Sequence, residues 1–239
     1  MNLYKMKLTL QKNDSETKAK IAIPNWVADI NPEAVIFKGR WYTALKRIMD
    51  LILIILILPI AILLLTICAI SIKIENIEAP VIFSQTRTGR GGKLFKMYKF
   101  RTMVPNADDL KKQYAHLNEL AWPDFKIKND PRITKVGKFL RKTSLDELPQ
   151  IYNILIGNMS IVGPRPTSFG PDTYDIWHTE RFDVLPGVTG LWQIFGRGEA
   201  EFDEKLRLDI LYVNKRCLRL DILLLLKTIP VIVSGKGSY

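Results

Sequence analysis

The apolar residues of this chain are unevenly distributed, and one long run dominates the pattern. Residues 51–72, LILIILILPIAILLLTICAISI, contain no charged side chain over 22 positions. As an α-helix the run is about 33 Å long, and the hydrocarbon core of a bilayer is roughly 30 Å thick. It begins too far along the chain for a signal peptide, and no small-residue cleavage site follows it. The pattern therefore predicts a membrane helix, within a segment that we delimit as residues 38–73.

Two features favour a helix that enters and leaves the bilayer on the same side. Pro59 lies inside the run, where its missing backbone N–H kinks a helix. Cations flank both ends: Lys38, Arg40, Lys46 and Arg47 come before, and Lys73, Arg87 and Arg90 come after. A spanning helix is expected to have its cations mainly on one side. A re-entrant helix broken at Pro59 fits these flanks, but proline also occurs in true spans, so both topologies stay open.

Shorter patterns follow the apolar run. Residues 81–103, VIFSQTRTGRGGKLFKMYKFRTM, predict two strands around a turn at residues 88–92. Helical spacing occurs at residues 107–120, around 137–140, after 144 and at 202–213, and residues 158–166 contain a strand-like piece. Residues 220–233 are apolar but too short to span a bilayer, so we expect them at the membrane interface or on the core.

Together these patterns predict an α+β fold that is mostly helical with a small β-hairpin. It is membrane-associated through the proline-broken, re-entrant helix and through interfacial helices. We expect three parts: a polar N-terminal extension (1–37) that is loosely structured or lies on the surface, the membrane helix (38–73), and a domain outside the bilayer (74–239).

The amino-acid composition limits the kinds of ligand and metal ion that this protein is expected to bind. The chain has 239 residues, a net charge of +11 and a pI near 9.6, so we expect an anionic partner such as nucleic acid, acidic lipid or a phosphorylated substrate. Its two cysteines, Cys68 and Cys217, form neither a disulfide framework nor a CxxC zinc motif. The two histidines, His116 and His178, have no motif partners. Any metal would therefore be held by oxygen ligands, which suits magnesium.

An adjacent acidic pair, Asp146 and Glu147, follows a basic run and allows two interpretations. Residues 144–147, SLDE, fit a capping box with Ser144 as the N-cap of a helix, and acids in a first turn are favoured by the helix dipole. The same two carboxylates also suit chemistry, as a nucleophile and a metal ligand. A helix beginning at Ser144 would aim its free N–H groups at a bound phosphate, so both interpretations are compatible.

Four motifs follow the apolar helix in order: FKMYKFRTM, DPRITKVGKFLRKTSLDELPQIYNIL, GNMSIVGPRP and PGVTGLWQIFGR. Together they resemble the bacterial sugar transferases, the monotopic polyprenyl-phosphate phosphoglycosyl transferases. The resemblance runs from about Arg40 to the C-terminus. It is to the short form, in which no large membrane domain precedes the catalytic part.

The resemblance implies an enzyme that moves a sugar 1-phosphate from a nucleotide diphosphate sugar, usually a UDP-sugar, to polyprenyl phosphate with release of UMP. It implies a covalent phosphosugar intermediate on Asp146 and a magnesium ion bound by Glu147. Residues 74–239 would then be a catalytic domain on the cytoplasmic face of the bacterial inner membrane, acting at the first membrane step of exopolysaccharide, capsule, O-antigen or glycoprotein glycan assembly.

Further side chains are expected to bind phosphate or nucleotide. Arg141 matches a phosphate-binding arginine of the family, and Arg165 is fixed between Pro164 and Pro166 as a clamp. The remaining candidates are Lys99 and Arg101, which face the substrate or lipid headgroups, Arg197, expected at the nucleotide, and Asp209, either a second acidic ligand or a salt-bridging residue. Many family members have an arginine before the Pro-Gly at 186–187. This chain has Leu185 there, with Arg181 four residues earlier.

The expected partners are a nucleotide sugar, polyprenyl phosphate and anionic membrane lipid, and a homo-oligomer stays open. A nucleic-acid partner is disfavoured because the cations cluster beside the apolar run and no recognition motif is present. Two alternatives remain: a non-catalytic membrane scaffold of the same assembly machinery, which would not need the acidic pair, and a glycosyltransferase that moves the sugar alone and releases UDP. Nothing in the sequence is diagnostic of one sugar.

Overall fold

The structure is a computed structural model that describes residues 23–119, 125, 127–167, 174–195 and 201–234, apart from the side chain of Val233. The described α-helices are α2 (Asn25–Ala28), α3 (Gly39–Glu75), α4 (Ala107–Gln113), α5 (Lys135–Lys142), α6 (Gln150–Leu155), α7 (Leu191–Phe195), α8 (Phe202–Lys215) and α9 (Leu218–Ser234). The strands are β1 (Ile82–Thr88), β2 (Leu94–Phe100), β3 (Ser160–Val162) and β4 (Gly187–Thr189). Short 3₁₀ helices span Arg90–Gly92, Ala115–Leu117, Leu145–Glu147 and Ile176–Asp183. The described part is therefore mostly helical with little sheet, as predicted.

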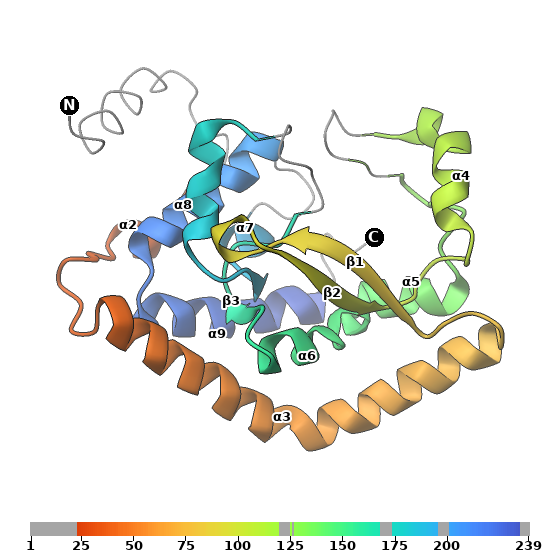
Figure 1. Cartoon of the computed structure of the whole chain (residues 1–239), viewed down its shortest axis with the longest axis horizontal. Helices are drawn as coiled ribbons and strands as arrows, with labels where there is room; N and C mark the ends of the chain where they lie inside the picture. The colour runs from red at the N-terminus through yellow and green to blue at the C-terminus, as the bar shows by residue number, and fades with distance from the viewer. Residues whose placement is uncertain (1–22, 120–124, 126, 168–173, 196–200, 235–239) are drawn as a thin grey trace.

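One long helix, α3, lies beneath the rest of the described chain and bends near its middle (Figure 1). Pro59 lies in this middle region, and its missing N–H removes one helical hydrogen bond where the helix bends. By length and composition α3 is apolar enough to cross a membrane, and only 17% of its most apolar window is buried. Much of its apolar surface is therefore left for lipid to cover.

Both ends of α3 are fastened to the same folded domain. In the first half, Asp50 accepts hydrogen bonds from Ser160 Oγ at 2.7 Å and from the backbone N–H of Ile161 at 3.3 Å. At the far end, Glu75 Oε1 accepts from the first backbone N–H groups of α5, at Lys135 (2.8 Å) and Val136 (3.2 Å). An acid at a helix N-terminus also complements the helix dipole. These contacts hold both halves of the bent helix against one domain.

The first half of α3 carries a second, buried attachment to α9. Asp221 is completely buried and accepts from Tyr42 at 2.9 Å and from Tyr212 at 2.7 Å. Lys46 Nζ lies 3.0 Å from the same carboxylate. A buried carboxylate is tolerated when it is paired and hydrogen-bonded in this way, so the network around Asp221 fixes α3 against α9.

The predicted hairpin is confirmed. Strands β1 and β2 pair antiparallel from Ile82 opposite Phe100 to Thr88 opposite Leu94. Gly91 and Gly92 in the connection have φ values of 64° and 76°, a backbone region that glycine adopts without strain. A second sheet pairs β3 with β4 in parallel, and a Cβ at Gly187 would meet the Gly163 nitrogen at 2.1 Å. This close approach places the loop after β3 against β4.

Three buried clusters form the core. The largest lies among α7, α8 and α9, and the other two join α3 to the hairpin, one beside α6 and one beside α5. Val27 and Ile30 are buried in the largest cluster. Val27 and Ile30 thus anchor the described end of the N-terminal segment to the core, whereas Ile36 and Phe37 are exposed, as expected for a surface-lying stretch. Residues 1–22 lie outside the described part.

Several predicted elements differ in detail. The helix expected at 107–120 ends as α-helix at Gln113 and continues as the 3₁₀ helix Ala115–Leu117. The segment expected at 220–233 forms α9, whose Leu220 and Leu224 are fully buried while Leu226 and Ile229 are exposed. One face of α9 therefore packs on the core and the other remains available to a membrane interface.

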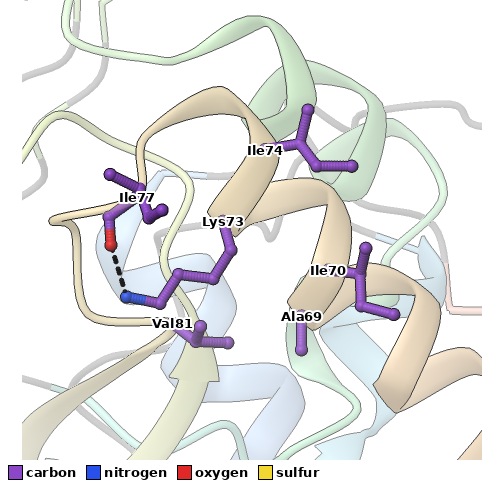
Figure 2. Close-up of a pocket in the computed structure, with 6 residues that line it drawn as sticks. All are labelled: Ala69, Ile70, Lys73, Ile74, Ile77 and Val81. Carbon is purple, nitrogen blue, oxygen red and sulfur yellow. Dashed lines mark hydrogen bonds between the residues drawn. The ribbon is translucent and has the colours of Figure 1, made fainter.

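An apolar hollow of about 480 Å³ lies at the end of α3 (Figure 2). It is lined by Ala69, Ile70, Lys73, Ile74, Ile77 and Val81. Its one charged group, Lys73, donates to the Ile77 carbonyl at 2.7 Å. The lining offers no carboxylate or hydroxyl for chemistry, so the candidate site must be sought elsewhere.

The network around Asp221 predicts a large stability loss in Asp221→Asn. The substitution keeps the shape but removes the charge opposite Lys46, and breaking a buried pair in this way costs about 3–5 kcal/mol. The measurement is thermal unfolding of purified protein in detergent.

Asp109→Asn is the matched control, because Asp109 lies on α4 with an exposed side chain. Its effect should stay within about 0.5 kcal/mol. Equal melting temperatures for the two variants would contradict a structural role for the network.

Candidate active site

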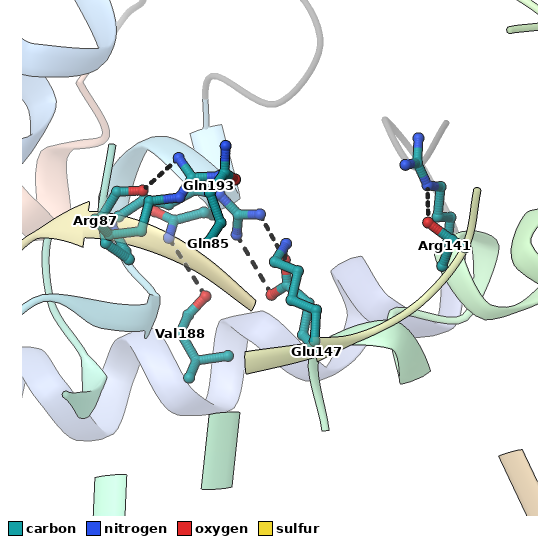
Figure 3. Close-up of polar contacts among 10 residues, drawn as sticks. Gln85, Arg87, Arg141, Glu147, Val188 and Gln193 are labelled. Atoms are coloured by element: carbon teal, nitrogen blue, oxygen red, sulfur yellow. Dashed lines mark hydrogen bonds and ion pairs between the residues drawn. The ribbon is translucent and has the colours of Figure 1, made fainter. Parts of the chain in front are cut away.

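Glu147 is the point where separate parts of the chain converge. Its Oε1 accepts from Lys99 Nζ, on β2, at 2.8 Å and from Arg165 Nη2, in the loop after β3, at 2.5 Å. Arg165 Nη1 lies 3.4 Å from Oε2. Figure 3 shows these contacts around Glu147. Lys99 and Arg165, both predicted to bind phosphate, are thus held side by side by one carboxylate.

Asn153 on α6 fixes the hairpin against the acidic pair. Its amide donates to the Lys96 carbonyl at 2.7 Å, and its Oδ1 accepts from the Tyr98 N–H at 3.0 Å. Asn153 is completely buried, so these bonds replace water as partners of the strand. Because α6 follows directly after the acidic pair, the same contact brings Lys99 to Glu147.

The local backbone of the acidic pair corrects the capping prediction. Ser144 adopts a left-handed conformation with φ 58°, and its side chain makes no capping hydrogen bond. Leu145–Glu147 form a single 3₁₀ turn, and α6 begins only at Gln150, after Pro149. The capping box at Ser144 is therefore wrong, and so are the helix N–H donors expected there. A positive φ at a residue other than glycine is uncommon and occurs often at functional sites.

The pKa values of the two neighbouring carboxyl groups are shifted in opposite directions. Burial disfavours ionisation of Glu147, but the charges of Arg165 and Lys99 outweigh it and hold the pKa of Glu147 well below its usual value. Burial raises the pKa of Asp146, with Lys99 opposing the rise and Glu147 adding to it. Pairs of acids whose environments push their pKa values apart are typical of active sites.

Arg141 approaches the acidic pair from the other side. It is held on α5, whose Gly137 packs so closely on Thr102 that an added Cβ would lie 2.1 Å from the Thr102 carbonyl oxygen. Arg141 Nε donates to Thr102 Oγ1 at 2.9 Å. Burial lowers the pKa of Arg141, and the charge of Asp146 opposes the shift. In Figure 3 Arg141 stands apart from the contacts around Glu147.

The buried ion pair between Arg181 and Asp209 contacts the backbone of Arg165. Arg181 Nη2 donates to the backbone carbonyl of Arg165 at 2.5 Å and to Asp209 Oδ2 at 2.5 Å. Both members of the pair are almost completely buried. Burial raises the pKa of Asp209, and the neighbouring Arg181 opposes the rise. Asp209 is therefore a salt-bridging residue here, which was one of its two predicted roles.

Arg87 is a site residue that the sequence analysis counted only among the flanking cations. It lies on β1, where its Nη2 donates to Gln85 Oε1 at 2.6 Å and its Nη1 to the Pro166 carbonyl at 3.3 Å. Burial, followed by repulsion from Arg165, lowers the pKa of Arg87 to about 10, against the attraction of Glu147. The alternating pattern of β1 could have placed Arg87 on the same face as Gln85, but not beside Arg165.

Among the described residues, the predicted Arg101 does not join this cluster. Arg101 donates from Nε to the Pro80 carbonyl at 2.9 Å and its guanidinium lies 5.7 Å from the Phe83 ring centroid, at the hairpin end near α3. Arg197 lies outside the described residues. Pro59 lies inside α3.

The donor set is compatible with magnesium. Among the residues that the structure describes, no group of three or more His, Cys, Asp or Glu side chains could hold a metal ion. Magnesium commonly uses one or two carboxylates and completes its coordination with water and substrate phosphates. Asp146 and Glu147 satisfy that requirement, although Glu147 Oε1 already accepts from two cations.

Comparison with known proteins agrees with the motifs. The family model described as bacterial sugar transferase matches residues 41–235. The chain is 44% identical over 200 residues to the undecaprenyl-phosphate galactose phosphotransferase of Salmonella typhimurium, covering 82% of this chain and 42% of that protein. It is 45% identical over 168 residues to the galactosyl transferase CpsE of Streptococcus agalactiae, covering 70% and 37%. It is 40% identical over 166 residues to the exopolysaccharide production protein ExoY of Rhizobium meliloti, covering 66% and 73%. The chain thus spans about two fifths of the first two relatives.

The buried Arg181–Asp209 pair predicts a pH-dependent defect in Arg181→Met. At pH 8 the variant must bury an unpaired carboxylate, a loss of about 3–5 kcal/mol. An acid whose folded-state pKa is raised stabilises the fold when protonated and loses that contribution as the pH rises through the folded-state pKa. The variant should therefore recover part of its stability at pH 5.5, as measured by thermal unfolding at both pH values.

Arg219→Met is the matched control, because Arg219 is exposed at the start of α9. Its small effect should be the same at both pH values. A pH-independent loss in Arg181→Met would show that Asp209 does not become a destabilising buried charge.

Proposed function

Because this chain belongs to the bacterial sugar transferase family, we propose that it transfers a sugar 1-phosphate from a UDP-sugar to undecaprenyl or another polyprenyl phosphate and releases UMP. The observation that carries the proposal is the acidic pair itself. Asp146 and Glu147 lie among Lys99, Arg141 and Arg165, and their pKa values are shifted in opposite directions. A phosphoryl transfer requires such positioning and positive charge more than any other help from a protein.

In the first step, a carboxylate oxygen of Asp146 attacks the phosphorus that carries the sugar. A P–O bond forms to Asp146, and the bond from that phosphorus to the bridging oxygen breaks. UMP leaves with the electron pair of the broken bond. Lys99 and Arg165 stabilise the negative charge on the transferred phosphoryl group, because Glu147 holds both of them beside Asp146.

In the second step, an oxygen of polyprenyl phosphate attacks the phosphorus of the aspartyl phosphosugar. The bond to Asp146 breaks, the carboxylate is regenerated and a polyprenyl diphosphate sugar is formed. Splitting the transfer into two displacements lets one set of cations serve two substrates in turn. Neither step requires a proton to remain on Asp146, so the deprotonated carboxylate is the reactive form.

Magnesium is the proposed cofactor, bound by Glu147 with Asp146 beside it. When bound, it would neutralise charge on the diphosphate of the donor. The contacts of Glu147 with Lys99 and Arg165 would then share this carboxylate with the metal ion.

The proposed location is the cytoplasmic face of the bacterial inner membrane, with α3 as a re-entrant helix. Asp50 and Glu75, near opposite ends of the apolar segment, both bind the same domain. A helix that spanned the bilayer would place its ends on opposite sides, about 30 Å apart. The exposed faces of α3 and α9 would lie in the lipid, and the acidic pair would meet the polyprenyl phosphate at the level of the headgroups. Anionic lipid would attract the flanking cations.

The relatives do not indicate one sugar. Their names include galactose, glucose and N-acetylgalactosamine, so the sugar is left out of the proposal. One relative is named a galactosyl transferase, which keeps transfer of the sugar alone as the second candidate. The nucleotide released separates the two reactions: UMP for sugar-phosphate transfer and UDP for sugar transfer.

The proposal predicts UMP release that depends on Asp146. Purified protein in detergent, with undecaprenyl phosphate and magnesium, should release UMP from at least one member of a panel of UDP-sugars. Asp146→Asn should reduce the rate by at least about 10³-fold, because an amide cannot replace the nucleophile. Chromatography of the nucleotides is the measurement.

Asp183→Asn is the matched control, since the side chain of Asp183 is exposed, and its rate should equal that of the wild type. UDP in place of UMP would favour the second candidate. A folded Asp146→Asn protein with wild-type activity would exclude the proposed nucleophile.

The re-entrant topology predicts that both ends of α3 face the same compartment. Cysteines at Arg40 and Glu78, both exposed, are introduced singly into a variant in which Cys68 and Cys217 are replaced by alanine. In intact spheroplasts, a membrane-impermeant maleimide should label neither position, and in lysed spheroplasts it should label both. Labelling of one position but not the other in intact spheroplasts would show a spanning helix.

A further inference from the structure

Arg87 is a partly buried cation, and its described hydrogen bonds use only part of its guanidinium. Its two described hydrogen-bond partners, Gln85 Oε1 and the Pro166 carbonyl, are both uncharged. Its Nε is buried with no hydrogen-bond partner among the described residues. Removing a cation from water is costly when no carboxylate contacts it directly, so the surroundings of Arg87 are suited to a negatively charged ligand.

The net charge of the side chains around the acidic pair also favours an anionic ligand. Within the part of the chain that the structure describes, four cations interact electrostatically with the two carboxylates, an excess of two positive charges. The cations are Arg87, Lys99, Arg141 and Arg165. Arg181 adds nothing to the excess, because Asp209 balances it. A substrate that carries a diphosphate would neutralise the excess.

The four cations are not equivalent in position. Arg141 has Asp146 as its strongest attractive partner, whereas Arg87 interacts with Arg165 and Glu147. Figure 3 shows Arg87 and Arg141 on opposite sides of Glu147. Arg165 interacts electrostatically with Glu147 and Asp146 and repels Arg87, so it is coupled to both ends of the cluster.

This order matches the requirements of an in-line displacement. The attacking and leaving oxygens lie on opposite sides of the phosphorus, and charge develops on the leaving phosphate. The proposed nucleophile, Asp146, interacts with Arg141, and the transferred phosphoryl group is expected beside Lys99 and Arg165. The leaving phosphate would then lie on the opposite side, next to Arg87.

We propose that Arg87 binds the phosphate of the departing nucleotide, the one that leaves as UMP, with Gln85 and the Pro166 carbonyl orienting its guanidinium toward it. The inference rests on the proposed function and adds to it a ligand for the leaving group. The two orienting contacts fix one plane of the guanidinium, and the remaining N–H groups form the fork that matches a phosphate.

Arg87 also joins β1 to the loop that carries Arg165, and a purely structural role must be separated from phosphate binding. If Arg87 only linked β1 to Pro166, its loss would lower the stability of the fold. It would also impair the binding of the nucleotide sugar and of polyprenyl phosphate to the same extent. A ligand of the leaving phosphate affects nucleotide binding selectively. The experiment therefore compares nucleotide affinity with stability and with the kinetics of the acceptor.

The test measures UMP binding by titration calorimetry, in detergent with magnesium, for wild type, Arg87→Met and Arg87→Lys. Arg90→Met is the matched control, because Arg90 is exposed at the turn of the same hairpin. We expect Arg87→Met to weaken UMP binding about 10- to 100-fold, the loss typical of charge-assisted hydrogen bonds. Arg87→Lys, which keeps the charge but not the fork, should give an intermediate loss, and Arg90→Met should bind as wild type.

The same proteins are assayed for the KM of each substrate and for melting temperature. Arg87→Met should raise the KM of the UDP-sugar by a similar factor while the KM of polyprenyl phosphate changes less than about 3-fold. UMP affinity within 2-fold of wild type in a folded Arg87→Met protein would overturn the inference, and so would equal losses for both substrates. If Arg87→Met does not fold, the same comparison of UMP affinity and of the two KM values is made with Arg87→Lys.

The outcomes for the function and for Arg87 are separable. A wild-type protein that binds UMP but releases no UMP from any UDP-sugar contradicts the proposed function, and the Arg87 variants still report on the phosphate site. A wild-type protein that releases UMP while Arg87→Met binds it normally contradicts only the inference. A wild type with no measurable affinity for UMP contradicts the inference as well.

Discussion

The pairing of Glu147 with Lys99 and Arg165 is the interaction on which the site depends. Two cations this close repel each other, and only a shared carboxylate lets both remain charged away from bulk water. Each of them comes from a different element, β2 and the loop after β3, so the pairing also joins the hairpin to the second sheet. The buried contacts of Asn153 with β2 and of Arg181 with the Arg165 carbonyl hold the two sides in place.

The two attachments of α3 set where the acidic pair lies relative to the exposed apolar surface of this helix. Asp50 binds the strand β3 that leads to Arg165, and Glu75 binds the first turn of α5, which carries Arg141. The long apolar helix α3 is therefore linked through short, polar contacts to the elements on both sides of the acidic pair. A change in the bend near Pro59 would move these two attachments relative to each other.

Local patterns predicted the elements, but they did not predict the contacts between them. The hairpin was predictable because glycines at its turn and alternating side chains are local signals, and the acidic pair stood out beside a basic run. The capping box at Ser144 was a misleading local signal: the backbone turns there with φ 58°, and Pro149 delays the helix. Arg87 was overlooked because its contact with Pro166 joins residues 79 positions apart, and no periodicity reports such a pairing.

Adjacency in sequence does not make Asp146 and Glu147 equivalent. Glu147 is ionised by direct contact with two cations, which also occupies its oxygens, whereas Asp146 has a raised pKa and no described side-chain contact of that kind. A carboxylate held by hydrogen bonds is a poor nucleophile because those bonds must be weakened before it attacks, while a less constrained neighbour keeps its lone pairs available. In the proposed reaction, the cations that hold Glu147 through hydrogen bonds would leave Asp146 as the carboxylate that attacks.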